Sequence, residues 1–357
     1  MKRILPFAVL VTLLLGFNSC GSKSNKVRKM VDSVGFATKS YQVDSVLARI
    51  ARLQGDSLSS KKEFNNVRVA VCPHDDYAYV GWIYPATLRN IKAKTVILFG
   101  VAHKAKRFGL ENKLIFESFD EWYAPAGDIK VSDYRSKLLA NMPADMVEVH
   151  DSMHTVEHSL ESMLPILQHF NPNLEIIPIL VPYMSFERIQ QISQALAGSM
   201  KKVFGEADLT WGKDYALLIT TDAVHYGDAD WGGKNYAPFG VDTAGYKKAV
   251  AHEHEVINTL TGTLTIPRVQ KFYGYTVDSS DYREYKWTWC GRYSVPLGLC
   301  TAIELEKLTD AQNLVGIPVG YANSIDHPTL PVEDLGMGVT APANIRHWVG
   351  YAAVVYP

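Results

Sequence analysis

The feature that most constrains this chain is a short apolar run that ends at a proline. Residues 67–72 read Val-Arg-Val-Ala-Val-Cys, a pattern typical of a largely buried β-strand. Pro73 has no backbone N–H to donate to a sheet, so we expect the strand to end there. His74, Asp75 and Asp76 follow at once. Because ligands of open α/β sheets bind beyond the carboxyl ends of the strands, this stretch predicts a functional site.

Two later stretches repeat this arrangement. Residues 95–99 form an apolar run that is followed by Gly-Val-Ala and then His103, and residues 215–219 form another that leads to His225. A single histidine after a strand is more often structural than catalytic. Three histidines in the same relation to three strands favour a shared metal site instead.

The rest of the chain alternates between segments of strand character and helix character. With 357 residues it can bury a large core, and it contains no internal repeat and no convincing domain boundary. The alternation therefore predicts one α/β domain. The predicted helices cover residues 42–53, 82–90, 132–140, 152–170, 186–204, 241–260 and 296–308, and the further predicted strands cover 174–181, 314–321 and 348–356.

The amino terminus resembles an export signal. Lys2 and Arg3 precede a mostly apolar run over residues 5–17, which is too short to span a membrane comfortably. A small residue stands directly before Cys20, as in the cleavage site of a bacterial lipoprotein. An ordinary secretory signal cut nearby is the alternative. In either case we expect the body of the protein to be exported.

We therefore expect a lipoprotein-type signal peptide over residues 1–20, a polar tether over 21–33 and a folded domain over 34–357. Lipid on Cys20 would anchor the exported protein to a membrane of the cell envelope, with the envelope or periplasm as the expected location. The formal net charge of -1 gives no sign of a nucleic-acid partner. A small-molecule substrate or ligand is the expected partner.

The four cysteines are too few for a disulfide scaffold. If Cys20 carries lipid, then Cys72, Cys290 and Cys300 remain, and these cannot all pair. At least one of them should be a free thiol or a metal ligand. We expect Cys72 and Cys300 to be buried in the core, because free cysteines commonly are.

One short motif suggests a different enzyme class. Residues 154–158 read His-Thr-Val-Glu-His and fit the H-x-x-E-H pattern of inverted zinc peptidases. On the helix predicted over 152–170, His154 and His158 would lie one turn apart and could bind one metal ion, with Glu157 as base. Such a short pattern recurs easily by chance. A zinc-dependent hydrolase is therefore the less favoured alternative.

A longer series of motifs runs through the whole chain. In order, the motifs are Pro73-His-Asp-Asp-Tyr77, Gly100-Val-Ala-His103, Glu157-His-Ser159, Thr220-Thr-Asp-Ala-Val-His-Tyr-Gly227, Cys290-Gly-Arg292 and Gly350-Tyr-Ala-Ala353. The series resembles the Memo family, which in bacteria and archaea is also called AmmeMemoRadiSam system protein B. The resemblance covers roughly residues 34–356. Each motif is short, but their order and spacing together are specific.

The resemblance implies a single three-layer α/β/α domain with a mixed, largely parallel central sheet, similar to the LigB-type extradiol dioxygenases. In those relatives two histidines and a carboxylate hold ferrous iron. In the Memo family three histidines and a cysteine surround the pocket, and by motif these metal ligands are His74, His103, His225 and Cys290. The resemblance gives catalytic roles to Cys290, His225, Asp222 and His158, and it places Glu157 at the same pocket.

The expected cofactor is a metal ion. Neutral imidazoles suit iron, copper or zinc, and a thiolate shifts the preference toward copper or zinc. With the resemblance, iron or copper is favoured and zinc is a further candidate. The expected function is that of a metal-dependent redox enzyme with a dioxygenase-like site, acting on a small molecule. The alternative from another class is a non-catalytic metal- or ligand-binding lipoprotein.

The chain departs from the family pattern near His74. Asp75 and Asp76 stand where small residues are common in the family, and they would add negative charge close to the metal. Aromatic side chains near the motifs could wall the pocket, although core packing suits at least half of them. These are Tyr77, Tyr79, Trp82, Trp122 and Tyr123.

Cys290 distinguishes this site from the carboxylate-bearing relatives. We expect Gly291 to adopt a positive φ in a tight turn that aims the thiol into the pocket. Arg292 would pair with Asp222 or Asp76, or cap the following helix. Beside Arg292 and a metal, the pKa of Cys290 should fall below about 8.5, so that Cys290 reacts with alkylating agents faster than Cys72 or Cys300.

Overall fold

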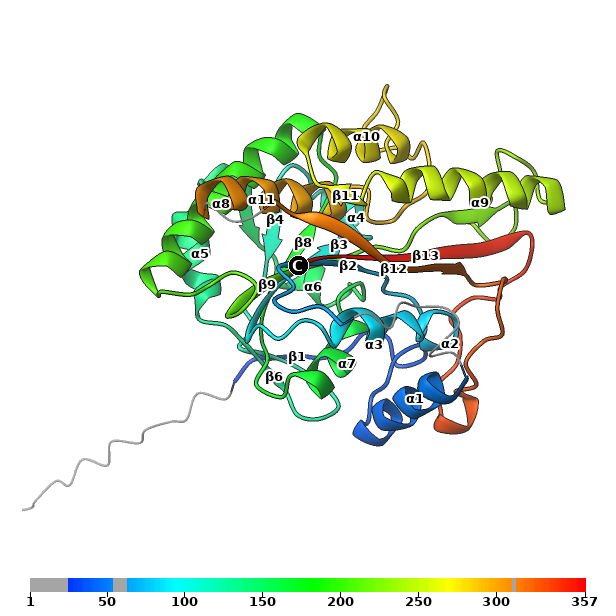
Figure 1. The fold of residues 1–357 in the computed structure, drawn as a ribbon, viewed down its shortest axis with the longest axis horizontal. Coiled ribbons are helices and arrows are strands. Elements are labelled where there is room, and N and C mark those ends of the chain that lie inside the picture. The colour runs from blue at the N-terminus through cyan, green and yellow to red at the C-terminus, as the bar shows by residue number, and fades with distance from the viewer. Residues whose placement is uncertain (1–24, 54–62, 310–312) are drawn as a thin grey trace, which may run out of the picture.

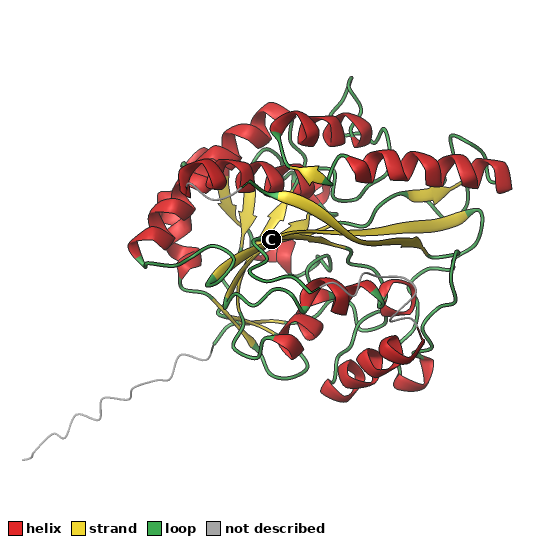
Figure 2. Cartoon of the chain, viewed as in Figure 1, coloured by secondary structure: helices red, strands yellow, loops and turns green. Residues whose placement is uncertain are grey.

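The computed structural model describes residues 25–53, 63–309 and 313–357, and in this part the chain forms three layers. A central sheet lies between two layers of helices, as Figures 1 and 2 show. This is the expected α/β/α arrangement. The export signal predicted over residues 1–20, with its Cys20, lies outside the described residues.

The centre of the sheet is parallel and one side of it is antiparallel. The parallel strands lie in the order β8, β3, β9, β2, and β13 and then β12 continue the sheet in antiparallel pairing. All of these strands are close to the ranges that the sequence predicts. Their bounds are β2 Val69–Cys72, β3 Thr95–Val101, β8 Glu175–Val181, β9 Tyr215–Thr220, β12 Val315–Asn323 and β13 His347–Tyr356.

Short strands complete the sheet at its margins, and none of them was predicted. The full order is β1-β5-β6-β8-β3-β9-β2-β13-β12-β11, while β4 pairs with β7 and β8, and β10 pairs with β13. The short strands are β1 Val27–Arg28, β4 Leu114–Phe116, β5 Glu121–Trp122, β6 Ile129–Val131, β7 Val147–Val149, β10 His225–Gly227 and β11 Gly262–Thr263.

The helices divide between the two faces of the sheet, and each face has its own buried apolar cluster. In Figure 1 the upper layer holds α5 Tyr134–Asn141, α8 Phe186–Glu206, α9 Thr243–Asn258, α10 Ile266–Thr276 and α11 Ser294–Thr309. The lower layer holds α1 Ser40–Leu53, α2 Tyr77–Val80, α3 Ile83–Leu88 and α7 Met163–Phe170. Two further short helices are α4 Ala105–Phe108 and α6 Asp151–His154. No helix in the described ranges is long and apolar enough to cross a membrane.

Local sequence explains the long helices. In α1, Val43, Val46 and Ile50 recur at helical spacing and are buried in the apolar cluster of the lower helix layer. Helix α8 begins after Ser185, whose side chain accepts the backbone N–H of Arg188 at 3.2 Å and so caps the first turn. Apolar burial on one face thus specifies α1, and α8 has a cap at its start in addition.

Strand register brings the carboxyl ends of three strands together. Cys72 at the end of β2 lies opposite Thr220 at the end of β9, and Phe99 in β3 lies opposite Ile219 in β9. The segments that begin at Pro73, at Ala102 and at Thr221 therefore leave the sheet at one edge. This confirms the arrangement predicted from the three apolar runs.

The first described residues are part of the fold. In β1, Arg28 is 1% exposed and forms an ion pair with Glu161, which is also buried. The Arg28 guanidinium donates to the carbonyl of His154 at 2.8 Å and stacks on Trp122 with its carbon 4.4 Å from the ring centre. The tether predicted over 21–33 therefore ends earlier than expected, because a buried arginine commits this segment to the domain.

The helix predicted over 152–170 is wrong, because the chain is interrupted between α6 and α7. The Glu157 carboxylate accepts the backbone N–H groups of His158 and Ser159, both at 3.0 Å, and thereby competes with helical hydrogen bonding. His154 and His158 consequently do not share one helical face.

The loop that carries Cys290 packs closely against the end of β9. A Cβ added at Gly291 would lie 2.3 Å from Cβ of Thr221 and 2.9 Å from Oγ of Ser294. The φ of Gly291 is not in the left-handed region, so the expected positive φ is wrong. Glycine is required here because the loop approaches the strand too closely for a side chain.

Gly291→Ala should therefore destabilise the fold by about 1–3 kcal/mol, since the added methyl group must displace the buried Thr221. The matched control is Gly198→Ala in α8, where an added Cβ meets no atom within 4 Å. That change should be neutral or stabilise the helix by up to about 1 kcal/mol. Urea unfolding measures both. Equal effects of the two substitutions would contradict the close approach.

Candidate metal centre

The predicted site residues converge on one hollow at the strand ends. His74, His103, His158, Asp222 and His225 all line a cavity of about 500 Å³. The remaining predicted residue, Cys290, lines a small cavity of about 50 Å³ that also contacts His103. The structure thus brings together every residue that the motifs assigned to the site.

His74 is held rigidly at the bottom of the hollow and is 2% exposed. Its Nδ1 lies 2.5 Å from Oγ1 of Thr220, and its backbone N–H donates to Oδ1 of Asp222 at 2.9 Å. Burial, followed by the neighbouring histidines, lowers the pKa of His74 well below its usual value. The ring is therefore neutral, and its Nε2 is the nitrogen left to face a ligand.

His103 is oriented by a buried carboxylate. Its Nδ1 lies 2.8 Å from Oε1 of Glu157, and its backbone N–H donates to Oε2 of the same group at 2.7 Å. Burial alone would raise the pKa of Glu157, but His103 and further hydrogen bonds lower it to about 2. Glu157 is therefore charged, and it leaves Nε2 of His103 available. A carboxylate on the far nitrogen is the usual partner of a metal-binding histidine.

His158 lies directly against the other two histidines. Its ring stacks on His103 with centres 5.0 Å apart and meets His74 edge-on at 5.9 Å. Burial, followed by His103, lowers the pKa of His158 to about 4. Ligand atoms of His74, His103 and His158 all lie within 4.8 Å of one another, so His158 is placed as well for metal binding as for the predicted catalytic role.

His225 stands slightly apart from this trio. Its Nε2 is buried and has no hydrogen-bond partner among the described residues, and it lies 4.0 Å from Oδ2 of Asp222. Burial, followed by His103, lowers the pKa of His225 to about 3. A buried neutral nitrogen without a partner carries a desolvation cost, which a metal ion bound in the hollow would remove.

Cys290 joins the site from the other side of Asp222. Its Sγ accepts the backbone N–H of Asp222 at 3.0 Å and lies 3.5 Å from Nε2 of His74. One oxygen of Asp222, Sγ of Cys290 and one nitrogen of His74 form a second group within 4.8 Å. Burial, followed by the charge of Asp222, raises the pKa of Cys290 well above its usual value. Without a metal ion the expected low pKa is therefore not found, and the expected rapid alkylation stays a prediction.

Arg292 does not form the pairs that were expected. Its guanidinium donates to Oη of Tyr293 at 2.9 Å and to the carbonyl of Arg283 at 3.0 Å. No ion pair joins it to Asp222 or Asp76 in the described part of the chain.

Asp75 and Asp76 are built into the wall of the hollow. Asp75 accepts the hydroxyl of Tyr351 at 2.6 Å, and Asp76 accepts the backbone N–H of Thr340 at 2.6 Å. Burial, followed by nearby carboxylates, raises the pKa of each to about 7. Both carboxylates thus form hydrogen bonds that stabilise the wall of the hollow, in addition to any effect that their charge has on a bound metal.

The inverted-peptidase geometry is absent from the described residues. His154 is fully buried with Nε2 at 3.0 Å from the carbonyl of Ile115, away from the cluster. Glu157 instead orients His103. The zinc-peptidase alternative is therefore wrong, because the broken helix turns His154 and His158 in different directions.

Two supporting residues were missed. Thr220 orients His74, and Glu253 in α9 accepts the backbone N–H of Val224 at 3.0 Å and Nε1 of Trp289 at 2.8 Å. Glu253 thus ties the residue before His225 to the residue before Cys290. Burial raises its pKa to about 7 against these hydrogen bonds. No local pattern around Glu253 indicates this role, because its partners are distant in sequence.

Most of the aromatic residues that were considered for the pocket wall pack in the core, as expected for at least half of them. The side chains of Tyr77, Tyr79, Trp82 and Trp122 belong to the apolar core instead of the pocket wall. Trp231 lines the hollow, and its ring lies 5.3 Å from His225.

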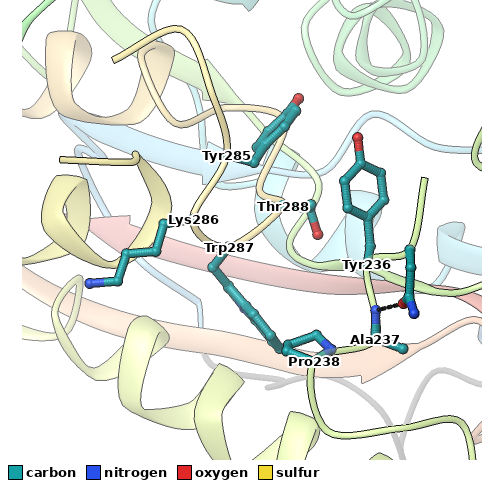
Figure 3. Close-up of a pocket in the computed structure, with 8 residues that line it drawn as sticks. Tyr236, Ala237, Pro238, Tyr285, Lys286, Trp287 and Thr288 are labelled. Carbon is teal, nitrogen blue, oxygen red and sulfur yellow. Dashed lines mark hydrogen bonds between the residues drawn. The ribbon is translucent and has the colours of Figure 1, made fainter. Parts of the chain in front are cut away.

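A neighbouring cavity of about 410 Å³ borders the site through Thr288, whose hydroxyl donates to the carbonyl of His225 at 2.5 Å. Figure 3 shows Tyr285 and Tyr236 beside this cavity, with both hydroxyls pointing away from Trp287.

The residues present fit a single metal ion. Thr220 and Glu157 occupy Nδ1 of His74 and His103, which leaves an Nε2 on each, and His158 completes a group of imidazoles whose ligand atoms lie within 4.8 Å of one another. His225 lies outside this group, with an Nε2 that has no hydrogen-bond partner among the described residues. A thiol and a carboxylate lie beside them. Imidazole and thiolate donors are typical of sites for iron, copper or zinc.

Comparison with known proteins agrees with the motif series. A MEMO1 family protein of Methanosarcina barkeri is 30% identical over 167 residues, which is 46% of this chain and 57% of that protein. A MEMO1 family protein of Pyrococcus horikoshii is 24% identical over 254 residues, or 70% and 79% of the two chains. These relatives are archaeal and give no support to the expected bacterial lipoprotein. The family model described as Memo-like protein matches residues 37–327, so the chain belongs to the Memo family.

Proposed function

We propose that this protein binds one metal ion at the strand-end hollow and uses it as a redox enzyme on a small molecule. The observation that carries the proposal is the set of imidazoles that line one hollow, two of them with Nδ1 already bonded so that Nε2 is the nitrogen left for a metal. His74 and His103 each have Nδ1 engaged, and Nε2 of His225 is buried without a hydrogen bond among the described residues. Such pre-oriented histidines are characteristic of metal centres.

The proposed ligands are His74, His103, His225 and Cys290. Iron or copper is favoured and zinc is a further candidate, since the thiol of Cys290 suits softer ions and the imidazoles suit all three. A bound redox-active metal would supply electron transfer and polarise a coordinated substrate.

The remaining site residues would handle protons. His158 is neutral, stacks on His103 and faces the cavity, so it can accept or donate a proton at its ring nitrogens. Oδ1 of Asp222 accepts the backbone N–H of His74, and Oδ2 of Asp222 lies 3.4 Å from Nε2 of the His74 ring. These two residues are the proposed catalytic pair beside the metal ligands.

We also propose that the protein is exported and anchored to a membrane by lipid on Cys20. The support is the sequence alone: two basic residues, a short apolar run and a cysteine after a small residue.

Metal analysis tests the ligand set. His74→Ala and His225→Ala should each remove most of the bound metal, because each deletes a converging nitrogen. The control is His154→Gln, which can keep the hydrogen bond to the Ile115 carbonyl and should retain the metal. Inductively coupled plasma mass spectrometry of the proteins, purified without residues 1–20, gives the ratios. Metal loss in His154→Gln with full retention in His74→Ala would reverse the assignment.

Oxygen uptake distinguishes an enzyme from a protein that only binds metal. Oxygen uptake with small phenols should occur with the metal-loaded wild type and fall at least 100-fold in His158→Ala, in which the metal should be retained, if His158 transfers a proton. Metal binding without any oxygen uptake would favour the non-catalytic alternative.

Cobalt substitution tests Cys290. If its thiolate is a ligand, the cobalt(II) protein should show a near-ultraviolet band from sulfur-to-metal charge transfer, and Cys290→Ser should abolish it and weaken binding at least tenfold. Cys300→Ser is the matched control, because Cys300 is an equally buried thiol in α11. A band that survives in Cys290→Ser would remove Cys290 from the ligand set.

Cell fractionation tests the location. The full-length protein should partition with membranes, and Cys20→Ala should be released from them or keep its signal segment, since the lipid attachment site is lost. Recovery of both proteins in the cytosol with Met1 intact would refute export.

A further inference from the structure

Arg292 is a buried cation at the back of the metal centre. It lies two positions after Cys290 and is 4% exposed. The guanidinium is held by two neutral oxygens, Oη of Tyr293 and the backbone carbonyl of Arg283. Among the described residues, no carboxylate lies within the 4.0 Å of an ion pair with it. Its charge is therefore not balanced by a protein anion.

The carboxylates nearby are directed to other cations. Glu111 pairs with Arg283 at 3.1 Å, and Glu284 lies 3.9 Å from Nζ of Lys234. Asp281 also faces Arg283, at 3.9 Å. These three acids line the same cleft as Arg292, yet each of them lies nearer to Arg283 or Lys234 than to Arg292.

Aromatic rings surround the guanidinium instead. Its carbon lies 3.5 Å from the ring centre of Tyr285, 4.7 Å from that of Tyr293 and 5.6 Å from that of Tyr183. Cation–π contacts compensate part of the cost of removing a cation from water, and that cost exceeds the gain from a few such contacts. Aromatic packing alone therefore does not offset the burial of this charge.

Arg292 separates two cavities. The small cavity of about 50 Å³ that contacts His103 and Cys290 is also lined by Arg292. A larger cavity of about 450 Å³ lies beyond it, and Arg292, Tyr183 and Tyr285 line both. Tyr285 is visible in Figure 3 at the border of a third cavity. The cation thus faces a space of ligand size on one side and the metal centre on the other.

We propose that Arg292 binds the carboxylate of a small organic acid, which is the substrate or ligand of the metal centre. This assignment rests on the proposed function for its link to the metal. The acid enters through the larger cavity, and its carboxylate lies deepest, beside the guanidinium and close to His103 and Cys290. A planar guanidinium matches a carboxylate in shape and in charge, and one positive charge balances one carboxylate.

Arg292 also has a structural effect that the test must separate. By donating to the Arg283 carbonyl and to Tyr293, it holds the segment around residue 283 against the start of α11. A purely structural arginine would influence stability but would not distinguish a charged ligand from a neutral one.

Benzoate and its neutral analogue benzamide provide the probes, titrated calorimetrically into full-length protein from which metal has been removed. Benzoate should bind, and benzamide should bind at least tenfold more weakly. Arg292→Met should weaken benzoate at least tenfold. The matched control is Arg283→Met, which removes a cation from the same cleft but keeps the carbonyl that Arg292 contacts, and it should change the affinity less than threefold.

Equal binding of benzoate and benzamide, no binding of benzoate up to 50 mM (about 2 kcal/mol of standard binding free energy), or unchanged binding in folded Arg292→Met would overturn the proposal. If Arg292→Met does not fold, crystals of the wild type soaked in 4-bromobenzoate decide: bromine density beside Arg292 supports the proposal and its placement elsewhere refutes it. Because metal is absent from these titrations, a failure here is distinct from a failure of the metal-binding proposal.

Discussion

The site depends on one buried carboxylate, that of Asp222. Its Oδ1 accepts the backbone N–H of His74, and its own backbone N–H donates to Sγ of Cys290, so a single residue after β9 joins the loop after β2 to the loop before α11. Burial raises the pKa of Asp222 to about 7 against the hydrogen bond from His74. A cation bound in the hollow would favour its charged form. The residue that joins these loops would therefore also respond to a bound metal.

A second set of residues orients the imidazoles from behind. Thr220 and Glu157 engage His74 and His103, and Glu253 fixes the backbone beside His225 while it also binds the indole of Trp289 next to Cys290. These partners come from a strand end, an interrupted helix and α9. The rings are thus held before any ligand binds, which reduces the conformational entropy that binding would cost.

The surroundings of the centre differ on its two sides. The hollow on the histidine side is walled by Asp75 and Asp76, whose carboxylates are used in hydrogen bonds to Tyr351 and Thr340. The opposite side has the guanidinium of Arg292 among aromatic rings, and the carboxylates that line the same cleft, those of Glu111, Asp281 and Glu284, lie nearer to Arg283 or Lys234. A ligand with a carboxylate therefore fits beside Arg292 better than on the side of Asp75 and Asp76.

Local sequence patterns were enough to predict the α/β class, the long strands, most of the long helices and the residues that gather at the strand ends. Apolar periodicity and strand-end placement are local properties, and the motif series added His158 and Cys290. How these residues meet depends on three-dimensional packing. The helix expected at 152–170 breaks because Glu157 bonds nearby backbone N–H groups, Gly291 serves close packing instead of a left-handed turn, and burial raises the Cys290 pKa. Such effects arise between segments far apart in the chain, because hydrogen-bond competition, steric approach and desolvation depend on neighbours that local sequence does not specify.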